Sequence, residues 1–264
     1  MKSNVAINKN AYASARLVRH YVEADDLFPA ERAILEQVRS RLPDMAMLDV
    51  GVGGGRTVKY FGALARNCIG IDYAQPMIDA CQRRFADQSE RMTFELGDMR
   101  EMAGFGIGTF DFVLASNNVL DCVDFAGRQR AIAEVRRVMK PEGLFSFSTH
   151  NFQRLPALLA LSRRDMKHLP GRVREIALIR AANLHLGLAP LKRLSALDRA
   201  IVNDGTFGFK LRLAYIRPRV QLEDLAAAGF RDARVFSILS GEELPLDSRL
   251  ESVTDPSLYF LCRA

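Results

Sequence analysis

The sequence lacks the cysteine and histidine patterns that support disulfide frameworks and zinc sites. Its four cysteines form no C-x-x-C pair, and no histidine stands at zinc-binding spacing from them. Such spacing is what a structural zinc site or a small disulfide-bonded scaffold requires. We therefore predict reduced, hydrophobic cysteines and no metal ion. The cysteines are Cys68, Cys81, Cys122 and Cys262.

The sequence also lacks long apolar runs. No run approaches the roughly 18 to 20 residues that span a bilayer, so no transmembrane segment is expected. The opening MKSNVAINKN is polar and has no apolar segment of the kind that marks a signal peptide. A cytoplasmic location is the resulting expectation.

The composition is that of a globular chain with unevenly placed charge. Its 264 residues are 48% hydrophobic, which is enough for a full core in one large domain, with or without an insertion. The net charge is +6, but residues 151–220 hold fourteen Lys and Arg against four Asp and Glu. That segment therefore carries +10 and the remainder −4. The segment predicts either a negatively charged ligand or a solvated helical face.

Short apolar segments alternate with segments of helical spacing up to residue 150. Five strands that alternate with helices indicate a parallel sheet covered on both faces. Strands are predicted over residues 45–50, 67–72, 91–96, 110–116 and 144–150, and helices over 12–22, 29–42, 55–66, 75–87 and 127–143.

The pattern changes beyond the fifth strand. Residues 151–205 show helical spacing throughout. Residues 206–218 alternate apolar and polar side chains, which predicts a strand with one buried face. A helix is predicted over 219–228, and the last two strands over 230–239 and 257–264. The chain shows no internal repeat.

The stretch LDVGVGGGR, residues 48–56, places four glycines within five positions after the first strand. A glycine-rich turn there lets a ligand lie against the backbone beyond the strand ends. A dinucleotide site needs G-x-G-x-x-G, and its third glycine position holds Arg56, so NAD-dependent oxidoreduction is disfavoured. Arg56 itself is interpreted as a solvated helix residue, and the alternative is a contact with a carboxylate of the ligand. The pattern that is present is D-x-G-x-G-x-G, formed by Asp49, Gly51, Gly53 and Gly55.

Further motifs complete a resemblance to class I S-adenosylmethionine-dependent methyltransferases. GIDYAQPM spans the end of the second strand, ELGDM the end of the third and SNNVLD the end of the fourth. EVRRVMKPEGLFSFS resembles the approach of this family to its fifth strand. A glycine-rich loop alone is a weak signal, whereas the order of several motifs is specific. The resemblance covers residues 45–150 and the closing strands.

The resemblance implies an α/β fold with a doubly wound, seven-stranded, mostly parallel sheet of strand order 3-2-1-4-5-7-6. A helical insertion would separate strands 5 and 6, and the closing pair would form the antiparallel hairpin that distinguishes this fold from dehydrogenases. The predicted division is an N-terminal helical lid over residues 1–44, a cofactor-binding core over 45–150, a mainly helical basic cap over 151–217 and the C-terminal part of the sheet over 218–264.

The same resemblance implies where S-adenosyl-L-methionine, and its product S-adenosyl-L-homocysteine, would bind. Asp72 would accept hydrogen bonds from both ribose hydroxyls, and Asp98 would contact the adenine amino group or only cap a turn. Asp49 would reach the amino group of the cofactor or only cap its own turn. Asn117 and Asn118 would contact cofactor or substrate, or only form a turn. The implied cofactor-binding residues are Asp49, Gly51, Gly53, Gly55, Asp72, Tyr73, Asp98, Met99, Ser116 and Asn117.

Methyl transfer to a hydroxyl requires in-line positioning and removal of a proton. His150, at the end of the fifth strand in FSTHN, is the predicted base, with Asp121 as its orienting partner or as an acceptor for a substrate hydroxyl. The alternatives are a hydrogen-bonded strand-end role for His150 and a helix N-cap for Asp121. Tyr12 and Tyr215 either line the acceptor pocket or belong to the core. The remaining histidines, predicted to lie away from the sheet edge, are His20, His168 and His185.

Several acceptors are disfavoured by missing motifs. SNNVLD contains no proline, unlike the N-P-P-Y or D-P-P-Y loop with which this family methylates amino groups of nucleobases. No cysteine follows a proline, as cytosine-C5 methylation requires, and no Lys-Asp-Lys-Glu set marks 2′-O-ribose methylation. Nucleic acid is therefore not the expected partner.

The predicted function is methyl transfer from S-adenosyl-L-methionine to a hydroxyl, with an amine as the alternative, of a small-molecule or saccharide acceptor. The basic insertion over residues 151–217 favours an anionic or phosphate-linked acceptor. The alternative is an RNA-directed methyltransferase or a basic RNA-binding module that uses this insertion, which salt-sensitive RNA binding would reveal. A homodimer is compatible with the sequence.

Overall fold

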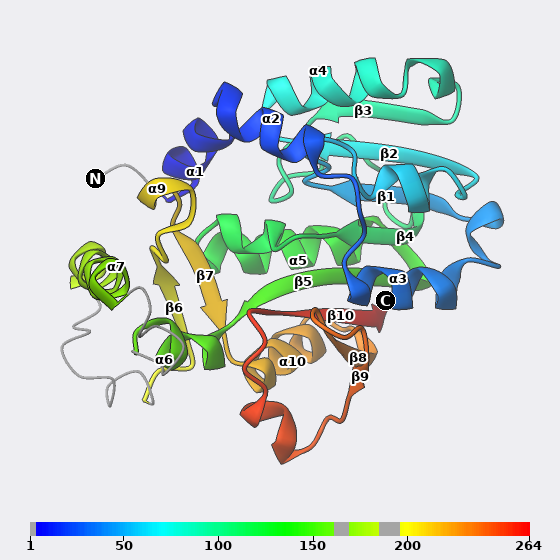
Figure 1. Ribbon diagram of the computed structural model, residues 1–264. Helices are drawn as coiled ribbons and strands as arrows, with labels where there is room; N and C mark the ends of the chain where they lie inside the picture. The colour runs from blue at the N-terminus through cyan, green and yellow to red at the C-terminus, as the bar shows by residue number, and fades with distance from the viewer. Residues whose placement is uncertain (1–3, 161–168, 185–195) are drawn as a thin grey trace.

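One mixed sheet of ten strands forms the centre of the structure, a computed structural model that describes residues 4–160, 169–184 and 196–264. The strands are β1 (Ala46–Val50), β2 (Asn67–Asp72), β3 (Met92–Leu96), β4 (Phe110–Ala115), β5 (Met139–Asn151), β6 (Arg199–Val202), β7 (Leu213–Ile216), β8 (Arg231–Ser237), β9 (Glu243–Leu244) and β10 (Ser257–Arg263). Their order is β3-β2-β1-β4-β5-β10-β8-β9, with β7 also beside β5 and β6 beside β7 (Figure 1). The strands from β3 to β5 are parallel, whereas β10 is antiparallel to both β5 and β8. The predicted α/β architecture with a mostly parallel central sheet is therefore confirmed.

The predicted seven strands in the order 3-2-1-4-5-7-6 are wrong for the whole sheet, because β6, β7 and β9 also join it. β5 has 13 residues and is longer than the strand predicted over 144–150. β4 ends at Ala115, opposite Phe147, so the last residues of β5 are open on that edge. β7 fills this edge, with Tyr215 paired to His150. The insertion thus contributes strands to the sheet.

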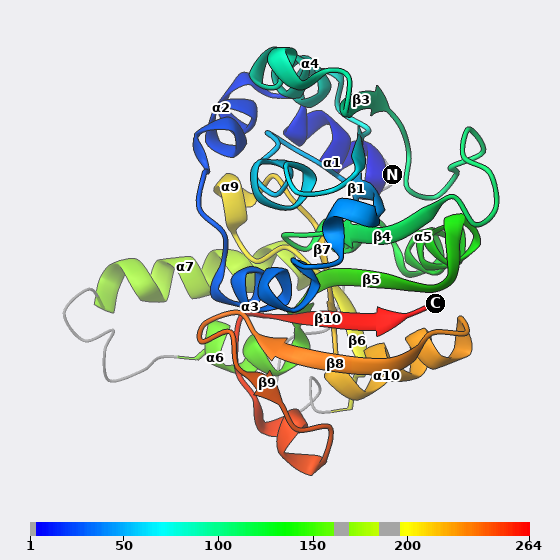
Figure 2. The same cartoon turned by 90° about the vertical axis from the view of Figure 1, so that its right-hand side faces the viewer.

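Helices cover both faces of the sheet, as Figure 2 shows for α3 on one side and α5 and α10 on the other. The longer helices are α1 (Asn4–Tyr12), α2 (Ala15–Glu23), α3 (Pro29–Val38), α4 (Gln75–Arg84), α5 (Phe125–Val138), α7 (Leu169–Ala182) and α10 (Pro218–Ala227). The short ones are α6 (Leu155–Leu158), α9 (Thr206–Phe209), η1 (Leu42–Asp44), η2 (Val58–Gly62), η3 (Ala86–Gln88), η4 (Val119–Cys122), η5 (Phe152–Arg154) and η8 (Ser248–Ser252).

The helix predicted over residues 55–66 does not form as a regular helix. Turns lead into the single π-helical turn η2, and further turns follow it. Glycine is a poor helix former, and Gly54, Gly55 and Gly62 all fall in or beside this segment. The glycine-rich stretch and the residues after it therefore act mostly as a loop.

The segment between β5 and α10 is less helical than predicted. Residues 199–202 form β6 within the stretch 151–205 that the spacing predicts as helical. The strand predicted over 206–218 begins only at Leu213, because residues 206–209 form the short helix α9. The alternation of apolar and polar side chains over residues 206–218 therefore predicts the strand correctly only at β7.

Parts of the predicted basic segment lie outside the described residues. These parts are residues 161–168 and 185–195. They include the predicted positions of His168 and His185 and the basic residues Arg163, Arg164, Lys167, Lys192 and Arg193.

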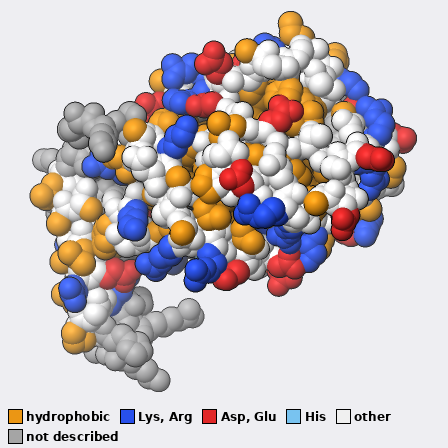
Figure 3. Space-filling view, turned by 90° about the horizontal axis from the view of Figure 1, so that it is seen from above, with side chains coloured by type: hydrophobic (Ala, Val, Ile, Leu, Met, Phe, Trp, Pro, Cys, Tyr) orange, Lys and Arg blue, Asp and Glu red, His pale blue; other side chains and the backbone are white. Residues whose placement is uncertain are grey.

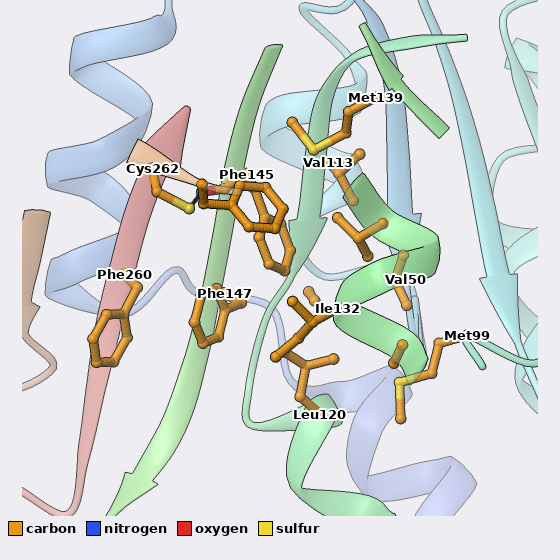
Figure 4. Packing of buried hydrophobic residues seen from close by; sticks show 14 of the residues in the cluster. Val50, Met99, Val113, Leu120, Ile132, Met139, Phe145, Phe147, Phe260 and Cys262 are labelled. Atoms are coloured by element: carbon orange, nitrogen blue, oxygen red, sulfur yellow. Dashed lines mark hydrogen bonds between the residues drawn. The ribbon is translucent and has the colours of Figure 1, made fainter. Parts of the chain in front are cut away.

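Two apolar clusters fill the two faces of the sheet. On one face, Phe145, Phe147 and Phe260 of β5 and β10 lie beside Ile132 of α5 (Figure 4). The rings of Phe147 and Phe260 stack with their centroids 5.1 Å apart. On the other face, Ile34 of α3 belongs to a cluster with residues of α4 and β1. All five residues of β1 are buried, as expected for a strand covered on both sides.

The N-terminal segment forms two helices, α1 and α2, where one helix is predicted over residues 12–22. The side chain of Asn8 in α1 is fully buried. Its amide nitrogen donates to the carbonyl oxygens of Cys122 and Arg212, each at 2.8 Å, and its oxygen accepts from the backbone N–H of Arg212 at 3.0 Å. These bonds hold α1 against the segment after β4 and against the start of β7.

Candidate functional site

A cavity of about 440 Å³ lies at the edge of the sheet where β1, β2 and β4 end. Its wall comes from α1, α2 and the chain up to Phe28, from the glycine loop after β1, from Asp72 and Tyr73, and from the segment after β4. Ligands of open α/β sheets bind at the carboxyl ends of the strands. The volume lies within the range of roughly 300 to 1,000 Å³ that is typical of ligand pockets.

The glycine loop is shaped by the protein's own packing as well as by the cavity. A Cβ atom on Gly51 would lie 2.0 Å from Val119 Cγ2, and one on Gly54 would lie 2.4 Å from the carbonyl oxygen of Tyr21. Gly53 lines the cavity and has a φ of +53°, which glycine adopts without strain. The positive φ and the space beside Gly53 thus leave room for a ligand to approach the backbone there, whereas neighbouring protein atoms account for Gly51 and Gly54.

Asp72, the last residue of β2, presents its carboxylate to the cavity. One oxygen accepts from the backbone N–H of Gly53 at 3.1 Å and the other from that of Ala74 at 2.9 Å. Burial raises the pKa of Asp72 to about 6, although the hydrogen bonds from Ala74 and Gly53 act in the opposite direction. Each carboxylate oxygen can accept a further hydrogen bond. The group can therefore bind two neighbouring hydroxyls of a ligand.

Phenol groups around the cavity are held in their neutral form. Burial raises the pKa of Tyr21 to about 12 and raises that of Tyr12 and Tyr73 well above the usual range. The Tyr73 hydroxyl is buried and has no hydrogen-bond partner among the described residues. Such orphaned polar groups are rare in folded proteins and call for a ligand or a water molecule. Tyr73 thus adds an available donor beside Asp72.

Arg56 is buried in a polar network, so its interpretation as a solvated helix residue is wrong. Its guanidinium forms two hydrogen bonds to the carboxylate of Glu31, at 2.5 and 2.7 Å. Ser116 and Tyr259 also donate to Glu31, and the Tyr259 bond is 2.9 Å long. Arg56 lines the cavity and stacks over the ring of Phe28 at 4.7 Å from its centroid. The network ties the start of α3 to the glycine loop, the end of β4 and β10.

Ser116 and Asn117 lie in the cavity wall, as predicted cofactor contacts should. Asn117 has a φ of +53°, and the following Asn118 has a φ of +62°. Both are asparagines, which tolerate this left-handed conformation better than most residues. The turn after β4 therefore places Asn117 in the cavity wall.

Asp49 and Gly55 lie behind the cavity wall. The carboxylate of Asp49 is buried and accepts a hydrogen bond from the Thr57 hydroxyl at 2.5 Å. Burial raises the pKa of Asp49 to about 7, against the lowering effect of that hydrogen bond. A contact of Asp49 with the cofactor, directly or through water, stays a prediction.

Asp98 and Met99 also lie outside the residues that line the cavity. Asp98 accepts two hydrogen bonds from the guanidinium of Arg100, at 2.9 and 2.5 Å, and this bonding lowers its pKa. Met99 is buried in the core beside Leu120 (Figure 4). An adenine contact by Asp98 stays a prediction, and it would require the Arg100 side chain to share or release the carboxylate.

The predicted catalytic pair, Asp121 and His150, forms a closed corner between β4 and β5. His150 Nδ1 lies 2.7 Å from Asp121 Oδ2, and its Nε2 lies 3.2 Å from the Asn118 side-chain nitrogen. Asp121 is fully buried and also accepts from Arg128 at 2.5 Å and from the Thr149 hydroxyl at 2.8 Å. Neither Asp121 nor His150 lines the cavity, and the N-cap of α5 is Asp124 instead. The structure brings the pair together but places it behind Asn118.

His20, predicted to lie away from the sheet edge, is instead part of the cavity wall. Its ring contacts the rings of Tyr21 and Phe207, with centroid distances of 5.4 and 5.1 Å. Tyr12 also lines the cavity, whereas Tyr215 stacks on His150 outside it. The sequence feature that could have located this wall is the group of aromatic side chains Tyr12, His20 and Tyr21 in the N-terminal segment.

The described residues hold no group of three His, Cys, Asp or Glu side chains that would bind a metal ion. Within the same residues, no helix has the length and apolar character needed to cross a membrane.

The fold is that of class I, Rossmann-like S-adenosylmethionine-dependent methyltransferases, and the resemblance inferred from the sequence is confirmed. Residues 48–147 match the family described as "Methyltransferase domain". A solved structure of 1,6-didemethyltoxoflavin-N1-methyltransferase from Burkholderia thailandensis, with 1,6-didemethyltoxoflavin and S-adenosylhomocysteine bound, has a TM-score of 0.61 at 15% identity. The match covers 98% of this chain and 87% of that one. At this identity the likeness shows the fold.

Two curated relatives match shorter stretches. Malonyl-[acyl-carrier protein] O-methyltransferase from Methylovorus sp. is 28% identical over 174 residues, which cover 59% of this chain and 56% of the relative. Trichosetin synthetase PKS-NRPS1 from Gibberella fujikuroi is 31% identical over 114 residues, which cover 40% of this chain and 3% of that protein. The chain thus spans less than two thirds of the length of these relatives.

Proposed function

We propose that the protein transfers a methyl group from S-adenosyl-L-methionine to a hydroxyl or amine of a small-molecule acceptor bound in the cavity. The observation that carries this proposal is the Asp72 carboxylate, which ends β2, faces the cavity and keeps accepting capacity on both oxygens beside the glycine loop. The solved relative is an N1-methyltransferase and the curated relative an O-methyltransferase, so they support methyl transfer and leave the acceptor atom open.

The residues of the cavity fit the proposed cofactor. Asp72 would hold the ribose hydroxyls, and the Tyr73 ring and its unpartnered hydroxyl would face the nucleoside. Gly53, Ser116 and Asn117 would face the amino-acid end of the cofactor. When bound, S-adenosyl-L-methionine would supply an electrophilic methyl group on a sulfonium sulfur.

We assign removal of the acceptor proton to His20 in preference to His150. A general base must come within hydrogen-bond reach of the proton that it removes. His20 lines the cavity, whereas both ring nitrogens of His150 already face Asp121 and Asn118. His150 would instead be a positioning residue, because it holds Asn118 and through it the turn that carries Asn117.

Calorimetry with S-adenosyl-L-homocysteine tests the proposal, and NAD is the matched control. We expect saturable binding of S-adenosyl-L-homocysteine and none of NAD. A chain that binds NAD, or that binds neither compound, would contradict the proposed function.

A further inference from the structure

Four aromatic side chains lie together at one side of the cavity, and we call them the aromatic wall: Tyr12, His20, Tyr21 and Phe207. The Tyr12 and Tyr21 ring centroids are 5.7 Å apart, and Phe207 lies 5.1 Å from His20 and 6.3 Å from Tyr21. The first three line the cavity, and Phe207 supports them from the insertion. The wall therefore joins α1, α2 and α9, three elements far apart in the sequence.

Phe207 is held in a strained backbone conformation. Its φ is +50°, Gly208 follows with +70° and Phe209 with +66°. A non-glycine residue in this left-handed region costs on the order of 1 to 3 kcal/mol, and such strain gathers at ligand sites. Since Phe207 and Phe209 both adopt this unfavourable conformation, contacts with the rest of the protein must stabilise the turn. One of those contacts is the ring of His20.

The hydroxyl of Tyr12 accepts a hydrogen bond from Cys122 Sγ at 3.4 Å and is also hydrogen-bonded to the Tyr21 side chain. Burial raises the pKa of Tyr12 and Tyr21 above neutral pH, so both phenols stay uncharged hydrogen-bond donors. The aromatic wall therefore offers flat apolar surface and neutral donors.

Two charged residues that line the cavity are already paired within the protein. Arg56 is paired with the buried Glu31, and Asp25 is paired with Lys59 and Arg84. A phosphate or carboxylate on the acceptor would meet no unpaired cation among the described residues that line the cavity.

The described basic side chains of the insertion do not change this picture. Arg199 pairs with Asp224, and Arg217 pairs with Asp198 and Glu251. None of the described residues of the insertion lines the cavity. On the face shown in Figure 3, basic and acidic side chains are interspersed.

We propose that the aromatic wall binds the acceptor, and that the acceptor is a flat, uncharged aromatic or heteroaromatic ring that carries the hydroxyl or amine. This inference rests on the proposed function and replaces the anionic acceptor that the charge of the insertion predicts. Aromatic pairs contribute about 0.5 to 1.5 kcal/mol beyond the area they bury. Loss of one ring face should therefore weaken binding by roughly 2-fold to 10-fold.

The test is equilibrium binding of 2-naphthol, followed by its fluorescence, to protein saturated with S-adenosyl-L-homocysteine. Glucose 1-phosphate is the anionic comparison ligand. The variants are Tyr12→Leu, which removes a ring of the wall, and Tyr12→Phe, which keeps it. Tyr60→Leu is the matched control, because Tyr60 is a half-buried tyrosine that does not line the cavity.

We expect 2-naphthol to bind more tightly than glucose 1-phosphate. Tyr12→Leu should weaken 2-naphthol binding by roughly 2-fold to 10-fold, whereas Tyr12→Phe and Tyr60→Leu should change it less than 2-fold. If S-adenosyl-L-homocysteine binds but glucose 1-phosphate outcompetes 2-naphthol, the aromatic acceptor is wrong and the proposed function stands. The same conclusion follows if Tyr60→Leu weakens 2-naphthol as much as Tyr12→Leu. If S-adenosyl-L-homocysteine does not bind, the proposed function and this inference fail together.

Discussion

Two corners at the carboxyl end of the sheet each contain a carboxylate, but they differ in how far its hydrogen-bonding capacity is used. Asp72, at the cavity, accepts one backbone N–H on each oxygen. Asp121, between β4 and β5, accepts four hydrogen bonds, from Arg128, from Thr149 and from both the backbone N–H and the ring of His150. An ionised carboxylate has about four acceptor sites. Asp72 therefore has capacity for a ligand, and Asp121 has none.

This difference separates binding chemistry from structural chemistry at the same edge. Strand ends attract polar residues for both purposes, since the backbone there also needs partners. The Asp121 corner resembles a buried ion pair that fixes the geometry of a turn. The Asp72 corner leaves the Tyr73 hydroxyl, in the cavity wall, without a partner among the described residues. The unpartnered atoms at the Asp121 corner, Arg128 Nε and Asn118 Oδ1, belong to residues that do not line the cavity.

Arg128→Met should produce the largest effect, on stability. Arg128 and Asp121 have side chains that are 1% and 0% exposed, and removing one partner of a buried ion pair typically costs about 3 to 5 kcal/mol. Chemical denaturation should show a loss of this size in the free energy of unfolding. The double variant Asp121→Asn with Arg128→Met should recover part of it.

Arg249→Met is the matched control for that prediction. Arg249 pairs with Asp247 at an exposed site, where an ion pair contributes about 0 to 1 kcal/mol. If Arg128→Met and Arg249→Met lower the free energy of unfolding equally, the buried ion pair of Arg128 with Asp121 does not have the structural role assigned to it.

Asp72→Ala should weaken S-adenosyl-L-homocysteine binding by about 100-fold, equivalent to about 3 kcal/mol. Hydrogen bonds to a charged group contribute about 1.5 to 3 kcal/mol each, and two are expected from the ribose. Asp98→Ala is the comparison, because that carboxylate is partly exposed and already bound by Arg100. If calorimetry shows that Asp98→Ala weakens S-adenosyl-L-homocysteine binding more than Asp72→Ala does, the ribose is not bound by Asp72.

The order of the central strands and the place of Asp72 were accessible from the sequence because they depend on local signals. An apolar run followed by glycines or by an acidic residue marks a strand and its carboxyl end, and parallel strands bring those ends to one edge. The pairing of β7 with β5 has no local signal. This pairing is possible because β5 extends past the end of β4. The difference in strand length becomes visible only when the two strands are aligned in the sheet.

The roles of the histidines were inaccessible for a related reason. His150 lies near the end of a strand and has the sequence position of a catalytic base, but its two ring nitrogens contact Asn118 and Asp121, which come from another segment. His20 has no motif around it. Its place at the cavity follows from the packing of α1 and α2. That packing depends on contacts such as the hydrogen bonds of Asn8, whose partners lie more than 100 residues away in the sequence.

His20→Asn and His150→Asn should separate the two histidines. Loss of a general base typically lowers turnover by about 10²-fold or more. We therefore expect about 100-fold lower kcat for His20→Asn with unchanged affinity for S-adenosyl-L-homocysteine, measured by transfer of labelled methyl groups to 2-naphthol. His150→Asn should lower the free energy of unfolding and reduce kcat less than His20→Asn does. The reverse pattern, with the fold intact, would return the base to His150.

The smallest effect concerns the pH dependence of cofactor binding. The pKa of Asp72 in the fold is about 6, above the value of about 3.9 for a free aspartate. In the ligand-free protein this raised pKa gives a contribution to stability that is fully present below pH about 4 and is lost as the pH rises through about 6. Ribose hydroxyls donate to the ionised form, so affinity changes in the opposite direction.

Affinity for S-adenosyl-L-homocysteine should therefore be constant above pH about 7 and fall by up to about tenfold per unit as the pH drops below 6. Calorimetry from pH 5 to 8 measures this profile, and Asp72→Asn, which cannot ionise, should flatten it. A break near pH 7 that survives Asp72→Asn would assign the titration to Asp49, whose pKa is raised to about 7 by burial. That result would mean that the carboxylate behind the glycine loop, and not the one at the cavity, senses the bound cofactor.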